Sequence, residues 1–244
     1  MARIFITGSA DGLGQMAAQK LIREGHEVVL HARNKTRGRE ALAKTPGAKA
    51  VVTGELSDIT ETIALAEKVN QSGAFDAVIH NAGVYNASSK QILAVNTFAP
   101  YILTGLIRKP QRLIYLSSGL HKQGTLNLEG IAHGRISYSD SKLHVLMLAK
   151  ALARWWPGVY ANAVDPGWVP TKMGGKNAPD DLQKGYETQT WLAVSEDQSA
   201  KVSGGYFFHQ KERPHNLLAD TVEGQEKLLS LLEQLTGISL PDKY

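Results

Sequence analysis

The sequence predicts an α/β fold, a single domain in which one doubly wound parallel sheet carries helices on both faces. Short β-rich apolar runs alternate along the chain with stretches of helical periodicity, as expected for parallel strands joined by crossover helices. A glycine cluster directly follows the first apolar run, at the first junction between strand and helix. The 244 residues suffice for one large domain over 1–244, and no linker, repeat or low-complexity tract divides them.

The expected strands, in order, span 2–7, 26–31, 48–53, 75–80, 111–117, 159–164 and 204–208. Right-handed crossovers bring their carboxyl ends to one edge of the sheet, where such sheets bind ligands. The stretches 88–107 and 136–156 are apolar enough for helices that either lie in the core or pair with a second subunit, so a homo-oligomer stays open. A long loop, about 168–191, follows the sixth strand.

The first strand-to-helix junction contains Gly8, Gly12 and Gly14. Glycines in such a turn let the backbone approach a pyrophosphate, which the N–H groups and dipole of the following helix stabilise. The spacing Gly-x-x-x-Gly-x-Gly differs from the general dinucleotide motif Gly-x-Gly-x-x-Gly. A plain tight turn could have the same composition, but the position at the first junction favours a phosphate site.

The end of the second strand indicates which dinucleotide is bound. An NAD enzyme usually offers an acid here for the ribose hydroxyls, whereas an arginine accommodates the 2′-phosphate of NADP. No acid occurs between Val28 and Gly38, while Arg33 and Arg37 are available for charge-assisted contacts with phosphate. These arginines could instead be solvated charges at the start of a surface helix. We expect NADP(H) to be favoured over NAD(H).

Tyr138 and Lys142 are four residues apart, so on a helix their side chains share one face. A cation near a phenol favours the phenolate and would lower its pKa, which suits a tyrosine that exchanges a proton with an alcohol or ketone. Taken alone, the pair could equally be an aromatic residue packed beside a surface lysine. The serine pair that lies twenty residues upstream favours the catalytic interpretation.

With these residues, the chain resembles the short-chain dehydrogenase/reductase family, in particular its retinol-dehydrogenase-like and carbonyl-reductase-like branch. The similar motifs cover most of the chain in the family's order. They are Thr7-Gly8-x-x-x-Gly12-x-Gly14, Asn81-Ala82-Gly83, Val95-Asn96, Ser117-Ser118, Tyr138-x-x-x-Lys142, Asp165-Pro166-Gly167-Trp168-Val169-Pro170-Thr171 and the segment 202–207.

The resemblance implies a Rossmann-type NAD(P)-binding domain and an oxidoreductase of CH–OH or C=O groups in small molecules. It implies a catalytic tetrad of Asn96, Ser118, Tyr138 and Lys142. The implied cofactor contacts are Gly8, Ser9, Gly12, Leu13, Gly14, Arg33, Arg37, Glu55, Leu56, Asn81, Ala82, Gly83, Tyr138, Lys142, Pro166, Gly167, Val169 and Thr171.

In the mechanism that the resemblance implies, NADPH delivers hydride to a carbonyl carbon while Tyr138 protonates the oxygen. Ser118 hydrogen-bonds that oxygen, and Lys142 holds the nicotinamide ribose and lowers the Tyr138 pKa. Asn96 is expected to hold a water that relays protons. The same site could run NAD-dependent alcohol oxidation, and a non-catalytic dinucleotide sensor is a further alternative, although the complete tetrad argues against it.

Some positions depart from the family pattern. Glu55 stands where an aspartate usually contacts adenine, and Asp58 could serve instead. His80 replaces a frequent asparagine, and the segment 123–130 lengthens the chain between the serine pair and the tyrosine, which we expect to add loop beside the substrate pocket. His121 is the one histidine that the sequence would place near the substrate, although a surface or supporting position is favoured for it.

The loop from Trp168 to Trp191 is the expected substrate lid. Two adjacent glycines after Met173 fit a hinge, and Tyr186 adds a further large apolar side chain. Such a lid suits a bulky hydrophobic ketone or aldehyde. The alternative is that these aromatic residues anchor the loop to the core.

Composition sets broader limits. The net charge of +4 with dispersed basic residues does not favour nucleic-acid binding. The absence of cysteine excludes disulfides and thiolate chemistry, and the scattered histidines favour no metal site. The first strand begins at residue 2, which leaves no room for a signal peptide, and Leu143–Trp156 reads as a core or interface helix. We therefore expect a cytoplasmic protein that does not bind membranes.

Overall fold

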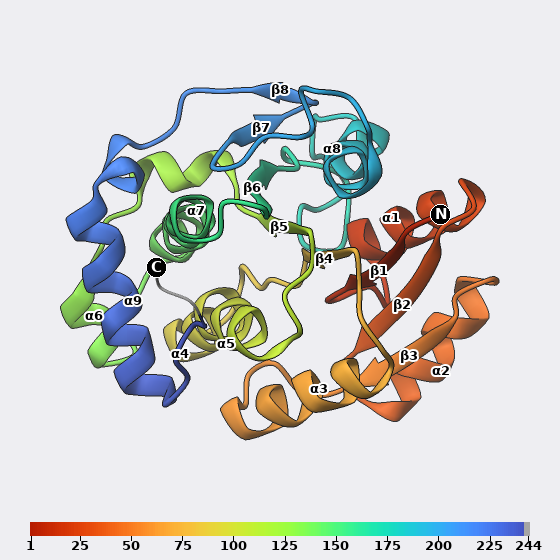
Figure 1. Ribbon diagram of the computed structural model, residues 1–244, viewed down its shortest axis with the longest axis horizontal. Coiled ribbons are helices and arrows are strands. Elements are labelled where there is room, and N and C mark those ends of the chain that lie inside the picture. Colours follow the sequence, from red (N-terminus) through yellow and green to blue (C-terminus); the bar gives the residue numbers. More distant parts are fainter. Residues whose placement is uncertain (242–244) are drawn as a thin grey trace.

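The computed structural model describes residues 1–241 and confirms the predicted fold class. One sheet has the strand order β3-β2-β1-β4-β5-β6-β7-β8, and its first seven strands are parallel (Figure 1). The strands are β1 Arg3–Ile6, β2 Glu27–Ala32, β3 Ala50–Thr53, β4 Ala77–His80, β5 Arg112–Leu116, β6 Tyr160–Asp165, β7 Tyr206–Phe208 and β8 Lys211–Glu212.

Helices cover both faces of this sheet (Figure 1). One layer contains α1, α2 and α8, and the other contains α3, α5 and α7, with α9 packed on the outside of α7. The longer helices are α1 Gly12–Arg23, α2 Lys35–Lys44, α3 Ile59–Gln71, α5 Ala99–Leu106, α7 Tyr138–Trp155, α8 Leu182–Val194 and α9 Val222–Thr236. The short ones are α4 Ser89–Ile92, η1 Leu93–Phe98, η2 Gly119–Gln123, α6 Leu128–Ala132 and η3 Leu217–Asp220.

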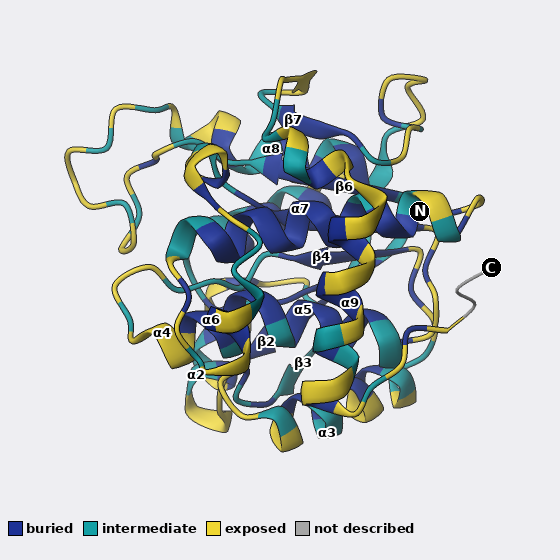
Figure 2. Ribbon diagram, turned by 90° about the vertical axis from the view of Figure 1, so that its left-hand side faces the viewer, coloured by how far each residue is buried: buried dark blue, intermediate teal, exposed yellow. Residues whose placement is uncertain are grey.

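The central strands are mostly apolar because they are buried on both faces. Successive side chains of a strand point to opposite faces. Ile4 and Ile6 thus enter the core beneath α1 and α8, whereas Phe5 between them enters the core beneath α3 and α7. Figure 2 shows the consequence, with buried strands and a buried α7 inside a shell of helices that are exposed on their outer faces.

Two features were not predicted from the sequence. The short strand β8 pairs with β7 in the antiparallel sense, so the sheet is not wholly parallel. The stretch expected as one helix over 88–107 is interrupted by η1, a π-helix of six residues that contains Asn96. π-Helical turns are rare and frequently occur at functional sites, and the local sequence here did not predict one.

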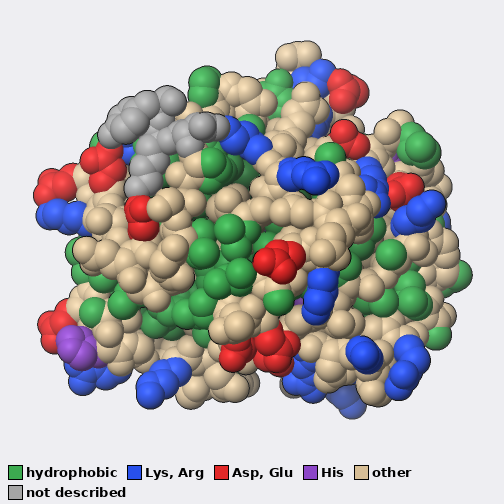
Figure 3. Space-filling model, turned by 60° about the horizontal axis from the view of Figure 1, so that its bottom comes forward, with side chains coloured by type: hydrophobic (Ala, Val, Ile, Leu, Met, Phe, Trp, Pro, Cys, Tyr) green, Lys and Arg blue, Asp and Glu red, His purple; other side chains and the backbone are tan. Residues whose placement is uncertain are grey.

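One face of the molecule, the lower side in Figure 1, carries apolar side chains gathered in its middle and charged side chains mostly around them (Figure 3). The oligomeric state remains a prediction. Each helix within residues 1–241 is too short or too polar to cross a lipid bilayer.

Candidate active site

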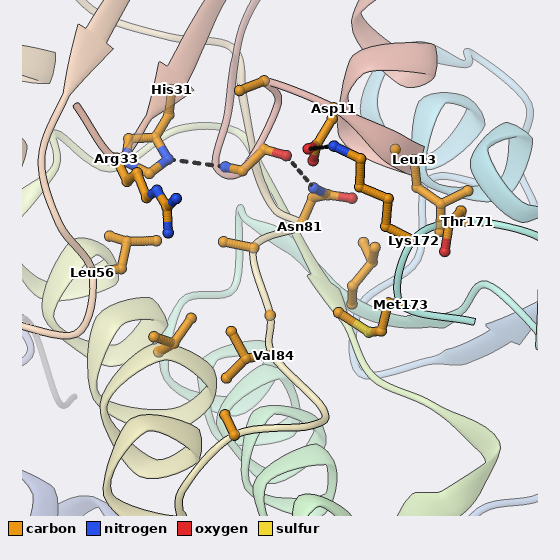
Figure 4. A pocket seen from close by; sticks show the side chains of 18 of the residues that line it. Asp11, Leu13, His31, Arg33, Leu56, Asn81, Val84, Thr171, Lys172 and Met173 are labelled. Atoms are coloured by element: carbon orange, nitrogen blue, oxygen red, sulfur yellow. Dashed lines mark hydrogen bonds and ion pairs between the residues drawn. The ribbon is translucent and has the colours of Figure 1, made fainter. Parts of the chain in front are cut away.

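A cleft of about 800 Å³ lies at the carboxyl edge of the sheet. Its lining brings together residues from most of the loops that follow β1 to β6, as Figure 4 shows for part of it. The predicted site residues that line it are Gly8, Gly12, Leu13, Arg33, Arg37, Glu55, Leu56, Asn81, Ala82, Gly83, Tyr138, Lys142, Pro166 and Thr171. Those outside the lining are Ser9, Gly14, Asn96, Ser118, Gly167 and Val169.

The glycine turn packs tightly against the loop after β4. Gly8 has a φ of +63°, and a Cβ on it would lie 2.8 Å from the Cα of Ala82. The Asn81 amide donates to the carbonyls of Thr7 and Gly8 at 3.0 and 3.1 Å. Because a Cβ on Gly14 would lie 2.4 Å from that same amide, only glycine fits there. Gly14 therefore shapes the turn from behind and does not face the cleft.

His31, which the sequence analysis missed, joins three loops of the cleft. Its Nδ1 accepts a hydrogen bond from the Gly8 N–H at 2.9 Å (Figure 4). Its Nε2 lies 2.9 Å from the Gly54 carbonyl. Burial lowers the pKa of His31 to about 4, so the ring is neutral and its Nε2 carries the hydrogen. Ser9 contributes in a similar way, since its hydroxyl donates to the Ile6 carbonyl and accepts from the His31 N–H.

Asp11 precedes α1 in the N-cap position but makes no side-chain cap. Aspartate is among the best N-cap residues, and Asp58 and Asp181 do cap α3 and α8. The Asp11 carboxylate instead bonds Arg37 at 2.6 Å and Lys172 at 3.1 Å. The N–H groups at the start of α1 thus lack a capping carboxylate, and they point where an anion would be stabilised.

The two arginines after β2 differ in their surroundings. Arg37 bonds Glu40 at 2.7 Å in addition to Asp11, so two carboxylates neutralise it. Arg33 is exposed at the edge of the cleft, and its guanidinium makes no hydrogen bond or ion pair with the described part of the chain (Figure 4). Of the two, Arg33 is the better placed to meet an added phosphate.

Glu55 and Asp58, the alternatives for the adenine contact, also separate. Asp58 accepts a hydrogen bond from the Glu61 N–H as the N-cap of α3. Glu55 and Leu56 line the cleft, and Glu55 accepts from the Ser57 N–H at 3.1 Å. The geometry therefore favours Glu55 over Asp58.

Tyr138 and Lys142 lie one turn apart at the start of α7, where Ser137 and Asp140 form a capping box. This cap fixes where the helix begins and hence which way the Tyr138 ring points. The Lys142 Nζ is buried, donates to the Leu116 carbonyl at 2.7 Å and lies 5.4 Å from the centroid of the Tyr138 ring. Ser118 lies close enough to Tyr138 to lower the pKa of its phenol.

The expected lowering of the Tyr138 pKa is not found. Burial raises the pKa of Tyr138 to about 12, and the neighbouring Ser118 opposes this only in part. Burial likewise lowers the pKa of Lys142 to about 8, against the attraction of the Asp165 carboxylate. Desolvation disfavours both charged forms, and here it outweighs the lysine–tyrosine proximity that the sequence spacing suggested.

Asn96 clamps the loop after β4. Its Oδ1 accepts from the Val84 N–H at 2.8 Å, and its Nδ2 donates to the Val84 carbonyl at 2.9 Å and to Ser141 at 3.1 Å. Each polar atom of the side chain thus has a partner within the protein. A water that Asn96 holds would bind the second lone pair of its Oδ1 or its backbone, which the π-helix displaces from regular α-helical bonding.

Part of the expected lid does not face the cleft. Thr171, Lys172 and Met173 line it. Tyr186 and Trp191 instead lie on α8 and pack against the core, with the Trp191 ring 5.8 Å from that of Phe207. They point inward because α8 covers the sheet. This agrees with the alternative that these aromatic residues anchor the segment to the core.

The segment after Ser118 is structural. His121 is buried, its Nδ1 lies 2.6 Å from the Ser118 carbonyl, and its Nε2 accepts from the Asn216 N–H at 3.2 Å. His121 therefore supports the serine and does not face substrate. None of residues 123–130 lines the cleft, and Thr125 is instead tied to Asp140 of α7 by hydrogen bonds of 2.8 and 3.0 Å.

No metal-binding group is found in the part of the chain that the structure describes, where no three histidine or acidic side chains gather suitably.

This fold and cleft define a Rossmann-type α/β protein. The family model of short chain dehydrogenases matches residues 2–182, and the chain belongs to that family. It is 45% identical over 255 residues to an uncharacterized oxidoreductase of Emericella nidulans. It is 42% identical over 259 residues to a short-chain dehydrogenase of Gibberella zeae, and each alignment covers 99% of both chains. Retinol dehydrogenase 14 of Mus musculus is 27% identical over 96% of this chain and 86% of its own, which agrees with the retinol-dehydrogenase-like branch.

Solved structures agree on the fold. A crystal structure of an uncharacterized protein from Mycobacterium paratuberculosis superposes with a TM-score of 0.81 at 24% identity, over 99% of this chain and 95% of that one. A blue fluorescent protein from a metagenomic library, crystallised in complex with NADPH, gives a TM-score of 0.69 at 20% identity, over 84% and 95% of the two chains.

Proposed function

We propose that the protein is an NADP(H)-dependent reductase of hydrophobic ketones or aldehydes, in which Tyr138 is the general acid. One observation carries the proposal: a single cleft joins the Tyr138–Lys142 pair at one end to the exposed Arg33 at the other. Membership of the short-chain dehydrogenase family supports the reaction class. A structural relative bound to NADPH is consistent with the choice of cofactor.

The cleft fits a dinucleotide. The uncapped start of α1 and the glycines with positive φ, Gly8 and Gly12, suit the pyrophosphate, and Arg33 suits a 2′-phosphate. Leu56 and Glu55 would flank the adenine, while Lys142 and Thr171 would hold the nicotinamide half. When bound, the reduced cofactor supplies the hydride.

The side chains of the protein would manage the proton. With a pKa of about 12, Tyr138 is protonated at neutral pH and can donate to the carbonyl oxygen of a substrate. Ser118, which lies beside Tyr138, would donate to the same oxygen and stabilise its developing charge. The Lys142 ammonium, held by the Leu116 carbonyl, would stabilise the phenolate that remains.

The test combines binding and turnover. Calorimetric titration should give a tighter Kd for NADPH than for NADH, and Tyr138→Phe should reduce ketone-dependent NADPH oxidation at least ~100-fold while leaving the NADPH Kd nearly unchanged. Tyr160→Phe is the matched control. Tyr160 lies at the amino end of β6, away from the cleft, and its side chain contacts the Arg112 guanidinium through the face of its ring. Retained activity in Tyr138→Phe would refute the proposed role of Tyr138, and tighter NADH binding would refute the choice of cofactor.

A further inference from the structure

Tyr85 lies against Tyr138, the proposed proton donor. It follows β4, and its ring meets that of Tyr138 edge to face, with centroids 4.8 Å apart at 84°. Although it makes this contact, Tyr85 is 46% exposed. A large aromatic residue that touches a catalytic side chain and also faces solvent is an informative exception to burial.

The position of Tyr85 is fixed by the active site itself. Asn96 clamps both backbone polar groups of the preceding Val84, at 2.8 and 2.9 Å. The Tyr85 carbonyl accepts from the Ala87 N–H at 3.0 Å, which tightens the turn that follows. These backbone hydrogen bonds, and not burial of the ring, fix the position of Tyr85.

Two more exposed apolar side chains come from the loops that follow β5 and β6 at the same edge of the sheet. Leu120 is 38% exposed, and its N–H donates to the Ser118 Oγ at 3.3 Å. Met173 is 46% exposed and lines the cleft together with Tyr138. Tyr85, Leu120 and Met173 come from three separate loops at the carboxyl edge of the sheet, and we refer to them as the apolar rim. Each retains apolar surface that a bound molecule would remove from water.

We propose that Tyr85 is a substrate-positioning residue whose exposed ring contacts an aryl group next to the reacting carbonyl, so that the substrate class is aryl ketones and aryl aldehydes. The inference rests on the proposed function. Aromatic rings favour edge-to-face and offset contacts, so the exposed Tyr85 ring suits a flat aromatic group. Thioether sulfur also packs well against ring edges, and Met173 lines the cleft. A short aliphatic ketone has less apolar surface to bury against these side chains than an aryl ketone has.

The test compares 1-acetonaphthone with 2-butanone as substrates of the wild-type protein and of Tyr85→Ala. We expect the variant to raise KM for 1-acetonaphthone roughly tenfold with little change in kcat, and to leave kcat/KM for 2-butanone nearly unchanged. Tyr85→Phe should retain the wild-type selectivity, because the ring and not the hydroxyl makes the contact. Leu42→Ala, which removes an exposed apolar side chain from α2, is the matched control and should change neither substrate.

Other outcomes would overturn the inference. Equal losses of kcat for both ketones in Tyr85→Ala would show that Tyr85 only supports the Tyr138 ring. If the wild-type protein reduces both ketones and Tyr85→Ala has the same selectivity between them, this inference alone is overturned. A wild-type protein inactive on both ketones with NADPH and with NADH would overturn the proposed function and this inference together. Thermal unfolding of each variant verifies that it is folded.

Discussion

The Asp11–Arg37 ion pair makes a quantitative prediction about cofactor preference. Asp11→Asn removes a carboxylate that bonds Arg37 at 2.6 Å inside the cleft. The change frees one face of the guanidinium and removes a negative charge from the neighbourhood where the 2′-phosphate is proposed to bind. We expect tighter NADPH binding and no change for NADH, because only NADPH carries that phosphate.

The size of the effect follows from exposure. The Asp11 and Arg37 side chains are 43% and 24% exposed, so solvent screens the pair and the ion pair itself is worth about 0.2–1 kcal/mol. A freed arginine gains a charge-assisted phosphate contact, screened to a similar degree, and loses the carboxylate that opposed it. Together these changes amount to about 1–1.5 kcal/mol, which is roughly a tenfold lower Kd for NADPH.

The assay is calorimetric titration of NADPH and NADH at low and high salt, since screening should shrink the effect as ionic strength rises. Glu40→Gln is one control, because it breaks the other ion pair of Arg37, at 2.7 Å, but retains the charge of Asp11. Lys172→Met is the second control, because Lys172 shares the Asp11 carboxylate at 3.1 Å. Both controls should change the NADPH Kd less than Asp11→Asn does.

An unchanged or weaker affinity of Asp11→Asn for NADPH would refute this reasoning. A selective loss of NADH affinity would mean that Asp11 contacts a ribose hydroxyl instead, and that the arginines do not decide the preference. An equal gain for both cofactors would place the effect at the shared pyrophosphate.

Two further predictions concern stability. Burial lowers the pKa values of His31, His80 and His144 to about 4, 3 and 4, so between pH 6.5 and those values the unfolded chain binds more protons than the folded protein. Urea denaturation should therefore show stability lost as the pH falls below 6.5, by about 2 kcal/mol for each histidine at pH 5, and a constant stability from pH 7 to 5 would contradict it. Gly14→Ala places a Cβ 2.4 Å from a side-chain amide and 2.7 Å from a backbone carbonyl, which should cost about 1–3 kcal/mol and impair NADPH binding. Gly158→Ala has open space within 4 Å and should be neutral in the same thermal-unfolding and binding measurements.

The sequence was sufficient to predict the fold, because the strands carry their signal locally. The centres of the predicted strands 26–31 and 111–117 are apolar on both faces, which a sheet covered by two helical layers buries. The observed strands β2 and β5 lie within one residue of those ranges. By contrast, β8 has only two exposed residues, Lys211 and Glu212, and so offers no hydrophobic pattern to detect.

At the site, residue types were predictable but their partners were not. Capping propensity predicts that the Asp11 side chain accepts a hydrogen bond from the first N–H groups of α1. Ion pairs with Arg37 and Lys172 instead hold its carboxylate away from them. His31 carries no motif, since its role depends on Gly8 and Gly54 meeting around it in the folded state. These assignments depend on which loops become neighbours in the folded protein, and the spacing of residues along the chain does not predict that.

The electrostatics of the catalytic pair set its resting protonation state. Spacing alone suggested a phenolate near neutral pH, which is the form that alcohol oxidation needs as a base. The buried pair instead combines a Tyr138 pKa of about 12 with a Lys142 pKa of about 8, so at neutral pH the phenol retains its proton and the ammonium retains its charge. A protonated tyrosine beside a charged lysine is prepared to donate a proton and to stabilise the anion left behind. By microscopic reversibility the same tyrosine would act as the base in alcohol oxidation, so these pKa values describe the resting protonation state of the pair, while the cofactor and substrate supplied set the direction of the reaction.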